Sequence, residues 1–369
     1  MSEITQETPT LKEFFDPKTI FFITIALIIM LIYFALSTQE QGGLSSIIDA
    51  LLQASIPFVV GAIIISFSVF GIDILIWRTI LSTIGIRPNL TQITNVYLTS
   101  LVFGILFPSG GTVEIGVRTA MGREFYNHFE GRNASAGEIL SSIALHRLIG
   151  TLAFLPFSVI AAIGLAILLE GYLPPYVGLF LVVTMATLAC FLAIIIFSTY
   201  FMPDQIIRLV SALPIISNYK AAIEVFVHDY NSSLSHLMKY KVKTVLIFFC
   251  AIGTAFISYL GGTLIVYSID SDISFFVAIF IIFLTGMLLM IPIPLPGMTG
   301  IKESVLAFLF NIYKPGQPEK SAAISILIGF TSFYLTVILG LSLYIVTRYF
   351  SFKKKKQKTV LSLEKTGEE

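Results

Sequence analysis

The stretch PIPLPGMTGIKE at residues 292–303 interrupts a strongly apolar run, and LFPSGGTVE at residues 106–114 does the same in the first half of the chain. Proline lacks a backbone N–H and keeps the preceding residue out of the helical conformation, while glycine permits a turn. Each break therefore separates two short helices and predicts a broken hairpin that enters the membrane and returns on the same side. The residues that form the breaks are Pro108, Gly110, Gly111, Pro294, Pro296, Gly297 and Gly300.

The composition around these breaks is that of a membrane protein. Hydrophobic residues make up 56% of the 369 residues and charged residues only 12%, against about 25% charged residues in a soluble domain. A water-soluble fold could not bury so much apolar surface, which excludes a soluble enzyme, a nucleic-acid binder and a disordered scaffold. Backbone groups in lipid need partners within their own segment, so the apolar runs must be helical. The sequence predicts an all-α polytopic membrane protein.

Full membrane spans and their direction follow from run length and charge. Six apolar runs reach the roughly 20 residues that cross a hydrocarbon core, at 19–36, 56–77, 138–168, 176–200, 243–267 and 321–347. Most Lys and Arg residues fall on one side if the N-terminus is inside, so the positive-inside rule places both termini in the cytoplasm. We expect about six full spans and two re-entrant hairpins in the plasma membrane. Counting each hairpin as two full spans satisfies the rule equally well.

The order of these elements repeats along the chain. In each half two spans precede a hairpin and one span follows it, and the two hairpins enter from opposite sides. This order predicts an inverted repeat, whose interrupted helices mark a substrate site near the midplane in transporters; two unrelated kinked helices are the alternative. The expected segments are a cytoplasmic N-terminal segment 1–18, a first half 19–168, the start of the second half 169–202, an amphipathic cytoplasmic connector 203–242, the rest of the second half 243–350, and a basic tail 351–369.

Five ionisable residues fall within or near the membrane: Glu114, Arg118, Arg147, Lys302 and Glu303. A charge at a helix centre costs roughly 2.5–3.5 kcal/mol on insertion scales, so these residues must pair, neutralise or line water. Glu114 and Arg118 are four apart and can pair on one helix face. Arg147 has no acidic neighbour in the sequence, and adjacent Lys302 and Glu303 point apart, so their partners should come from the other half. We expect a polar cavity for a charged group; snorkelling and structural ion pairs are the alternatives.

The helices that begin after the two breaks direct their free N–H groups toward the breaks, where anions bind well. Together with the three cations of the set they would suit a phosphate headgroup, and the two glutamates could receive an amine or a proton. No nucleotide-binding loop of the GxxxxGK[ST] type occurs, so this chain is not expected to be ATP-driven. Neither the cysteines nor the histidines have metal-ligand spacing, and we expect no metal, no cofactor and no catalytic residue among the five. Asp73, just before Trp77 and Arg78, is expected to anchor the chain at the inner interface.

Four segments, in this order, resemble the flippase-like transmembrane domain of the lysylphosphatidylglycerol synthase family. They are WRTILSTIGI at 77–86, LFPSGGTVEIGVR at 106–118, LHRLIGTLAFL at 145–155 and PIPLPGMTGIKESVLAFL at 292–309. Two positions depart from the family pattern, His146 where a glutamate is common and Met298 where a glycine is usual. The sequence shows no aminoacyl-transfer domain, so the resemblance does not imply synthase activity.

The resemblance implies translocation of a membrane lipid, with an anionic, amine-bearing or polyprenyl-phosphate-linked headgroup, and a possible partner synthase or glycosyltransferase. From the residues and this resemblance we expect a multi-pass protein that flips a polar or charged lipid headgroup between leaflets. One alternative is an intramembrane transferase acting on a lipid or polyprenyl-phosphate, for which Asp270 and Asp272 in an outer loop are the only candidate residues. The sequence is also compatible with a small-solute secondary transporter and with an auxiliary membrane subunit.

Overall fold

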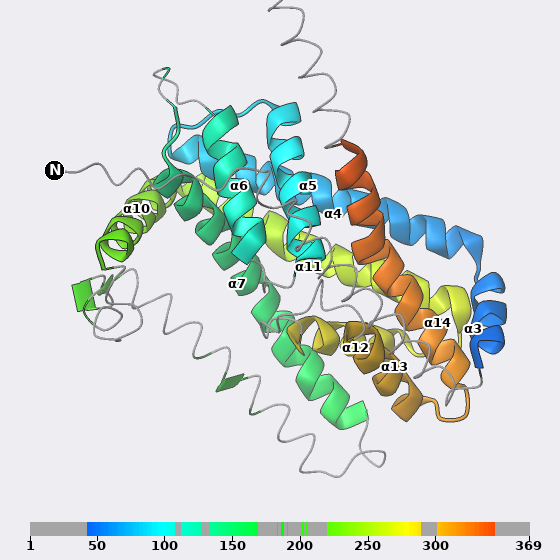
Figure 1. Cartoon of the computed structure of the whole chain (residues 1–369). Coiled ribbons are helices and arrows are strands. Elements are labelled where there is room, and N and C mark those ends of the chain that lie inside the picture. Colours follow the sequence, from blue (N-terminus) through cyan, green and yellow to red (C-terminus); the bar gives the residue numbers. More distant parts are fainter. Residues whose placement is uncertain are drawn as a thin grey trace, which may run out of the picture.

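The computed structural model describes residues 43–107, 112–126, 133–168, 220–288 and 301–343, with isolated positions between 131 and 208. All the regular elements in these ranges are helices (Figure 1). Four helical segments of the described residues are long and apolar enough to cross a membrane: Ile56–Thr83, Ala136–Gly164, Lys241–Ile269 and Pro318–Leu343. The protein is an all-α polytopic membrane protein, as its composition predicts.

The four segments coincide with the second, third, fifth and sixth spans that the sequence predicts, and their ends differ from the prediction by a few residues. The two remaining predicted spans, at 19–36 and 176–200, lie outside the described residues. So do both termini and the seven proline and glycine residues of the two breaks. The number of spans therefore stays a prediction.

The limbs of both predicted hairpins are helical. In the first hairpin they are α5, Leu90–Leu106, and α6, Thr112–Phe125; in the second they are α12, Phe275–Leu288, and α13, Ile301–Tyr313. Each limb has fewer than the roughly 20 residues that a full span needs. The re-entrant path itself stays a prediction, because the residues that join the two limbs of each hairpin lie outside the described ranges.

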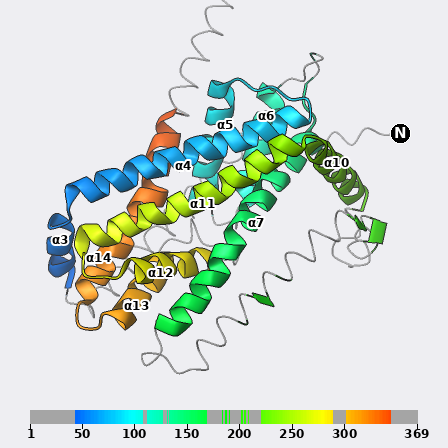
Figure 2. The same ribbon diagram turned by 180° about the vertical axis from the view of Figure 1, so that it is seen from behind.

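Two long helices form an antiparallel pair along one face of the bundle (Figure 2). They are α4, Ile56–Thr83, from the first half and α11, Lys241–Ile269, from the second. Glycine allows close approach near one end of their contact, where a Cβ on Gly61 would lie 3.2 Å from Leu264 and a Cβ on Gly261 would lie 2.9 Å from Ile65. Small residues at helix contacts are the usual means of close packing in membranes.

The last span of each predicted half packs against the predicted hairpin of the other half. Helix α7, Ala136–Leu168, places Gly164 against Phe280 of α12. Helix α14, Pro318–Gly329, continues through the π-helix η3, Phe330–Tyr334. The helical stretch beyond η3 places Gly340 against Leu98 and Val102 of α5. Reciprocal contacts of this kind are expected of an inverted repeat, which nevertheless remains a prediction.

We expect Gly340→Ala to destabilise the protein, because the added Cβ would lie 2.9 Å from the Leu98 carbonyl oxygen, a backbone atom that cannot turn aside. Overpacking of this kind costs roughly 1–3 kcal/mol, and the midpoint of thermal unfolding in detergent should fall. Gly253→Ala on α11 is the matched control, since nothing lies within 4 Å of its Cβ position. Equal midpoints for the two variants would show that the last span does not pack against α5 in this way.

Two further helices complete the described part. Helix α10, Lys220–Lys239, belongs to the predicted amphipathic connector and buries Tyr230 and Leu237 in a cluster shared with α7 and α11. Helix α3, Gly43–Leu52, is not among the helices predicted from the sequence, and its buried Ile47 packs against the alanines at the start of α14.

Candidate functional site

Arg118 is the centre of a buried polar cluster in the first half. Its side chain is only 2% exposed, and its Nε donates a hydrogen bond to Ser100 Oγ on α5 at 3.0 Å. The guanidinium carbon lies 4.5 Å from the ring centroid of Tyr97 and 5.0 Å from that of Trp77. Trp77 is fixed in turn, because its indole N–H donates to Ser142 on α7 at 3.1 Å. Aromatic faces and a hydroxyl thus hold the cation within the bundle.

Glu114 neutralises two cations at once. Its Oε1 accepts from Arg118 Nη2 at 2.5 Å and its Oε2 accepts from Arg147 Nη2 at 2.6 Å. The pair four residues apart that the sequence predicts is therefore confirmed. Arg147, which has no acidic neighbour in the sequence, forms an ion pair with the same carboxylate. Gly104 makes this possible, since a Cβ there would lie 2.8 Å from the Cβ of Glu114.

Asp73 adds a second carboxylate to this cluster. Tyr97, whose ring lies beside Arg118, donates its hydroxyl to Asp73 Oδ2 at 3.2 Å. Asp73 also lines a cavity of about 210 Å³, together with His146 on α7 and Tyr259 on α11. The cluster thus holds two carboxylates and two guanidinium groups, and charged groups at membrane depth are most often functional.

Replacing Arg118 by glutamine should break this cluster and change the emission of Trp77, the single tryptophan of the chain. Breaking a buried ion pair costs about 3–5 kcal/mol because a charge is left uncompensated, and water entering the gap should move the emission maximum to longer wavelength. Arg123→Gln, at an exposed position near the end of α6, is the control. Identical spectra for the two variants would contradict the stacking of Arg118 on Trp77.

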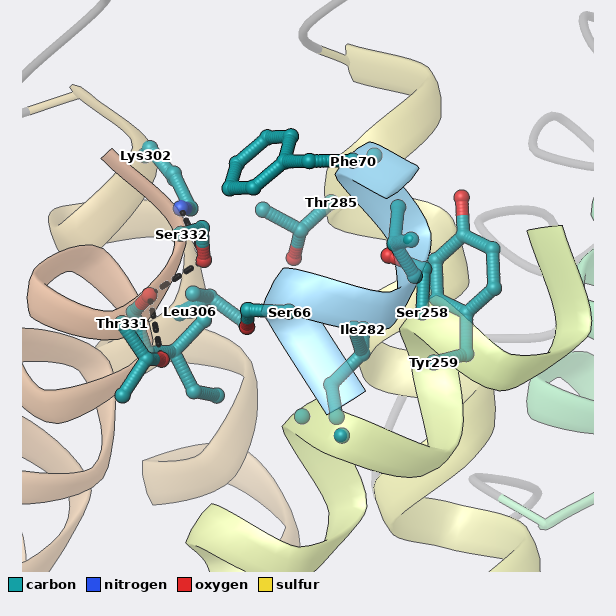
Figure 3. A pocket seen from close by; sticks show the side chains of 15 residues that line it. Ser66, Phe70, Ser258, Tyr259, Ile282, Thr285, Lys302, Leu306, Thr331 and Ser332 are labelled. Atoms are coloured by element: carbon teal, nitrogen blue, oxygen red, sulfur yellow. Dashed lines mark hydrogen bonds between the residues drawn. The ribbon is translucent and has the colours of Figure 1, made fainter. Parts of the chain in front are cut away.

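Lys302 faces a second cavity, of about 230 Å³ (Figure 3). The residue is 5% exposed, and its Nζ donates to Ser332 Oγ at 3.3 Å. Ser332 lies within the π-helix that interrupts the last span, and π-helical turns in α-helices are frequent at functional sites. The walls opposite Lys302 come from α4 and α11, so the cavity lies between the limbs of the second predicted hairpin and the α4–α11 pair.

Glu303 is buried beside this cavity, with 6% of its surface exposed. Its carboxylate lies against Gly329, where a Cβ would collide with Oε1. The sequence pattern predicts partners from the other half for Lys302 and Glu303. In the structure Lys302 contacts Ser332 and Glu303 contacts Gly329, and both partners belong to the last span of the same half. The first half contributes the α4 wall of the cavity.

The two cavities adjoin. Both are lined by Val69 of α4 and by Ser258 and Tyr259 of α11. Tyr259 is stacked on Phe283 with ring centroids 3.6 Å apart, and Figure 3 shows it across the cavity from Lys302. The bundle thus places a buried ammonium and a half-buried carboxylate in two cavities that share one aromatic wall. Together the two volumes reach the range of roughly 300–1,000 Å³ that is typical of small-ligand sites.

The two aspartates of the outer loop make ion pairs. Asp270, which is buried, accepts from Lys314 Nζ at 2.7 Å, and Asp272 lies 3.6 Å from the same ammonium. The hydrogen bond to Asp270 raises the pKa of Lys314 above its usual value. This arrangement ties α11 to the loop after α13 and gives Asp270 a structural role.

Sequence reasoning identifies five residues of these clusters but misses their surroundings. Glu114, Arg118 and Arg147 come together, whereas Lys302 and Glu303 lie at the neighbouring cavity. Asp73, expected as an interfacial anchor, instead joins the cluster around Arg118 through Tyr97. The missed signal is the spacing of Asp73 and Trp77, four residues apart on one face of α4, which puts an acid and an aromatic side by side.

The protein family described as lysylphosphatidylglycerol synthase TM region matches residues 21–340. The match includes both predicted hairpins and all five ionisable residues predicted for the site. No curated protein matches the chain.

Proposed function

Because the chain belongs to the lysylphosphatidylglycerol synthase transmembrane family, which suggests a membrane protein that handles lipids, we propose that it moves a polar or charged lipid headgroup between leaflets. The observation that carries this proposal is the pair of adjoining cavities, one with the ammonium of Lys302 and one with the carboxylate of Asp73. A headgroup that crosses the hydrocarbon core needs such polar partners, since no water solvates it there.

In this proposal Lys302 binds the phosphate of the headgroup. Its ammonium is fixed by Ser332, and hydroxyls of Ser66, Ser258 and Thr285 also line the cavity. The hydroxyls of Ser66 and Thr285 donate to the carbonyl oxygens of Ala62 and Ile281 in the structure, and in this proposal they turn to the oxygens of a phosphate that has lost its water. The acyl or isoprenoid chains would stay in the bilayer, so the cavity needs room only for the headgroup.

The first-half cluster supplies a second contact for the headgroup. Arg147 is the accessible member, with 43% of its side chain exposed, whereas Arg118 is buried. We assign the phosphate contact to Arg147. We assign a positioning role to Arg118, because its ion pair with Glu114 fixes the carboxylate that Arg147 also binds. Glu114 and Glu303 would receive an amine of the headgroup or a coupling proton.

The transferase alternative has weaker support. Its only candidate residues are Asp270 and Asp272, and the ion pairs with Lys314 give both a structural use.

We propose that the flippase lies in the plasma membrane with both termini in the cytoplasm. A synthase or glycosyltransferase that supplies or consumes the lipid is the kind of partner that this activity requires.

The proposal is tested by leaflet exchange in reconstituted vesicles. The lipids are labelled in their hydrocarbon chains and keep unmodified headgroups. Phosphatidylglycerol, phosphatidylethanolamine, phosphatidylcholine and a polyprenyl phosphate are placed in both leaflets, and the outer label is then quenched. A flippase makes the inner label accessible at a rate that depends on the headgroup. Protein-free vesicles give the background rate.

The same vesicles distinguish a flippase from a transferase. Recovered lipid should be chemically unchanged, and a lipid that has gained a group from another lipid of the panel would instead favour the transferase. No exchange of any lipid in the panel by folded protein would contradict the proposed function.

A further inference from the structure

A surface groove at one end of the α4–α11 pair concentrates positive charge that the two cavities do not use. Its volume is about 550 Å³, within the range of roughly 300–1,000 Å³ of small-ligand sites. Three of its lining residues, Arg78, Arg87 and Lys243, are cations, and none of the described residues that line it is acidic. The groove therefore suits an anion.

The position of this charge opposes the helix dipole. Lys241 and Lys243 lie in the first turn of α11, where the positive end of the helix disfavours cations. The N-cap residue Tyr240 makes no side-chain capping hydrogen bond. A sequence that breaks a local charge rule in this way often does so at a functional site, and a bound anion would compensate both the lysines and the helix end.

Two of the cations are held at the groove by contacts with the protein. Arg78 Nε donates to the carbonyl oxygen of Pro88 at 3.2 Å, and Lys243 Nζ lies 4.9 Å from the ring centroid of Tyr240. These contacts restrict the long side chains, so less conformational entropy is lost when a ligand binds. The groove is therefore better prepared for binding than three unconstrained surface cations would be.

Exposed apolar side chains continue from the groove toward the middle of the same two helices. Leu75 of α4 lines the groove and is exposed, and Leu246 and Phe249 of α11 are exposed further along. Helix α4 has 28 residues, more than the roughly 20 that cross the core, and the cations at its end favour the membrane surface for its last turns. An anionic head in the groove would thus have its hydrocarbon tails beside an apolar helix surface.

We propose that this groove binds the phosphate of an anionic phospholipid from the leaflet at this end of the bundle. A lining of cations without an acid, among the described residues, favours a headgroup with no ammonium group. The site lies outside the two cavities, so it goes beyond the proposed function and does not depend on it. It would place a lipid at the end of the helix pair whose inner surfaces line both cavities.

The test is native mass spectrometry of the full chain after exchange into a defined mixture of phosphatidylglycerol and phosphatidylcholine. The wild type should retain phosphatidylglycerol preferentially. The double variant Arg87→Gln, Lys243→Gln should lower that preference at least about tenfold, the factor expected if only one of the two charge-assisted contacts is lost. Arg123→Gln with Lys239→Gln is the matched control, because both positions are exposed, lie outside the groove and change the net charge equally.

Three outcomes would overturn the proposal. Equal loss of preference in both double variants would show unspecific attraction by surface charge. A wild type without preference would show that the groove holds no anionic lipid. Displacement of the retained lipid by excess inorganic phosphate would assign the groove to a soluble anion instead. Leaflet exchange measured on the same preparations reports the proposed function separately, so failure of one is distinguished from failure of the other.

Discussion

Replacing Glu303 by glutamine should abolish headgroup-dependent lipid exchange while leaving the protein folded. Glutamine has nearly the same shape but carries neither the charge nor an exchangeable carboxyl proton. Glu303 is buried beside the Lys302 cavity, and loss of one partner in a buried charged site costs about 2–5 kcal/mol. We expect the initial exchange rate to fall at least about a hundredfold, which corresponds to roughly 3 kcal/mol.

The controls separate a lost site from a lost fold. Glu124→Gln, at an exposed position at the end of α6, removes the same charge away from both cavities and should exchange lipid at the wild-type rate. Trp77 emission and the elution volume in detergent should be unchanged in Glu303→Gln. Gly329→Ala keeps the carboxylate but displaces it, because its Cβ would collide with Glu303, and it should also slow exchange. A wild-type rate for Glu303→Gln would remove this residue from the site.

Arg147→Ala should reduce exchange by about one to two orders of magnitude. Its guanidinium is the exposed cation of the first-half cluster, and it shares Glu114 with Arg118. A hydrogen bond to a charged group is worth about 1.5–3 kcal/mol, and each 1.4 kcal/mol changes the rate about tenfold. Arg147→Lys should restore part of the rate, because lysine keeps the charge but loses the planar geometry of the guanidinium.

A double-mutant cycle tests whether Arg147 acts through the contact seen in the structure. Glu114→Gln should slow exchange by itself, and combining it with Arg147→Ala should add less than the sum of the two effects, since the residues are 2.6 Å apart. Strict additivity would mean that the two side chains work independently. Arg147→Ala with a wild-type rate would contradict its assignment to the site.

Much of the fold follows from sequence pattern because membrane helices obey simple rules. The helices α5, α7, α11 and α12 follow from apolar runs, and α4 does so up to Arg78, beyond which it continues to Thr83. The limb α6 carries four charged residues and follows only from the proline and glycine break before it. The short α3 is missed although Leu44, Ile47, Ile48, Leu51 and Leu52 recur at helical spacing, because its ten residues are too few for the membrane spans that the apolar runs define. Its packing against α14 depends on contacts between distant segments, which no local pattern reports.

The candidate site is predictable in its residue types and less so in its pairing. Charges inside apolar runs identify Glu114, Arg147 and Lys302, because an intramembrane charge is costly unless it is used. The partner of Arg147 cannot be inferred from the sequence, since Glu114 lies on another helix and already has a partner four residues away. The role of Asp73 depends on Tyr97, which is brought to it by the packing of α5 on α4.

Translocation through the site at the hairpins is tested most directly by comparing wild type and Glu303→Gln in one leaflet-exchange experiment, on the lipid that the wild type moves fastest. We expect exchange well above protein-free vesicles for the wild type and a rate at that background for the variant. Equal rates for the two proteins, with both shown to be folded, would contradict translocation through this site.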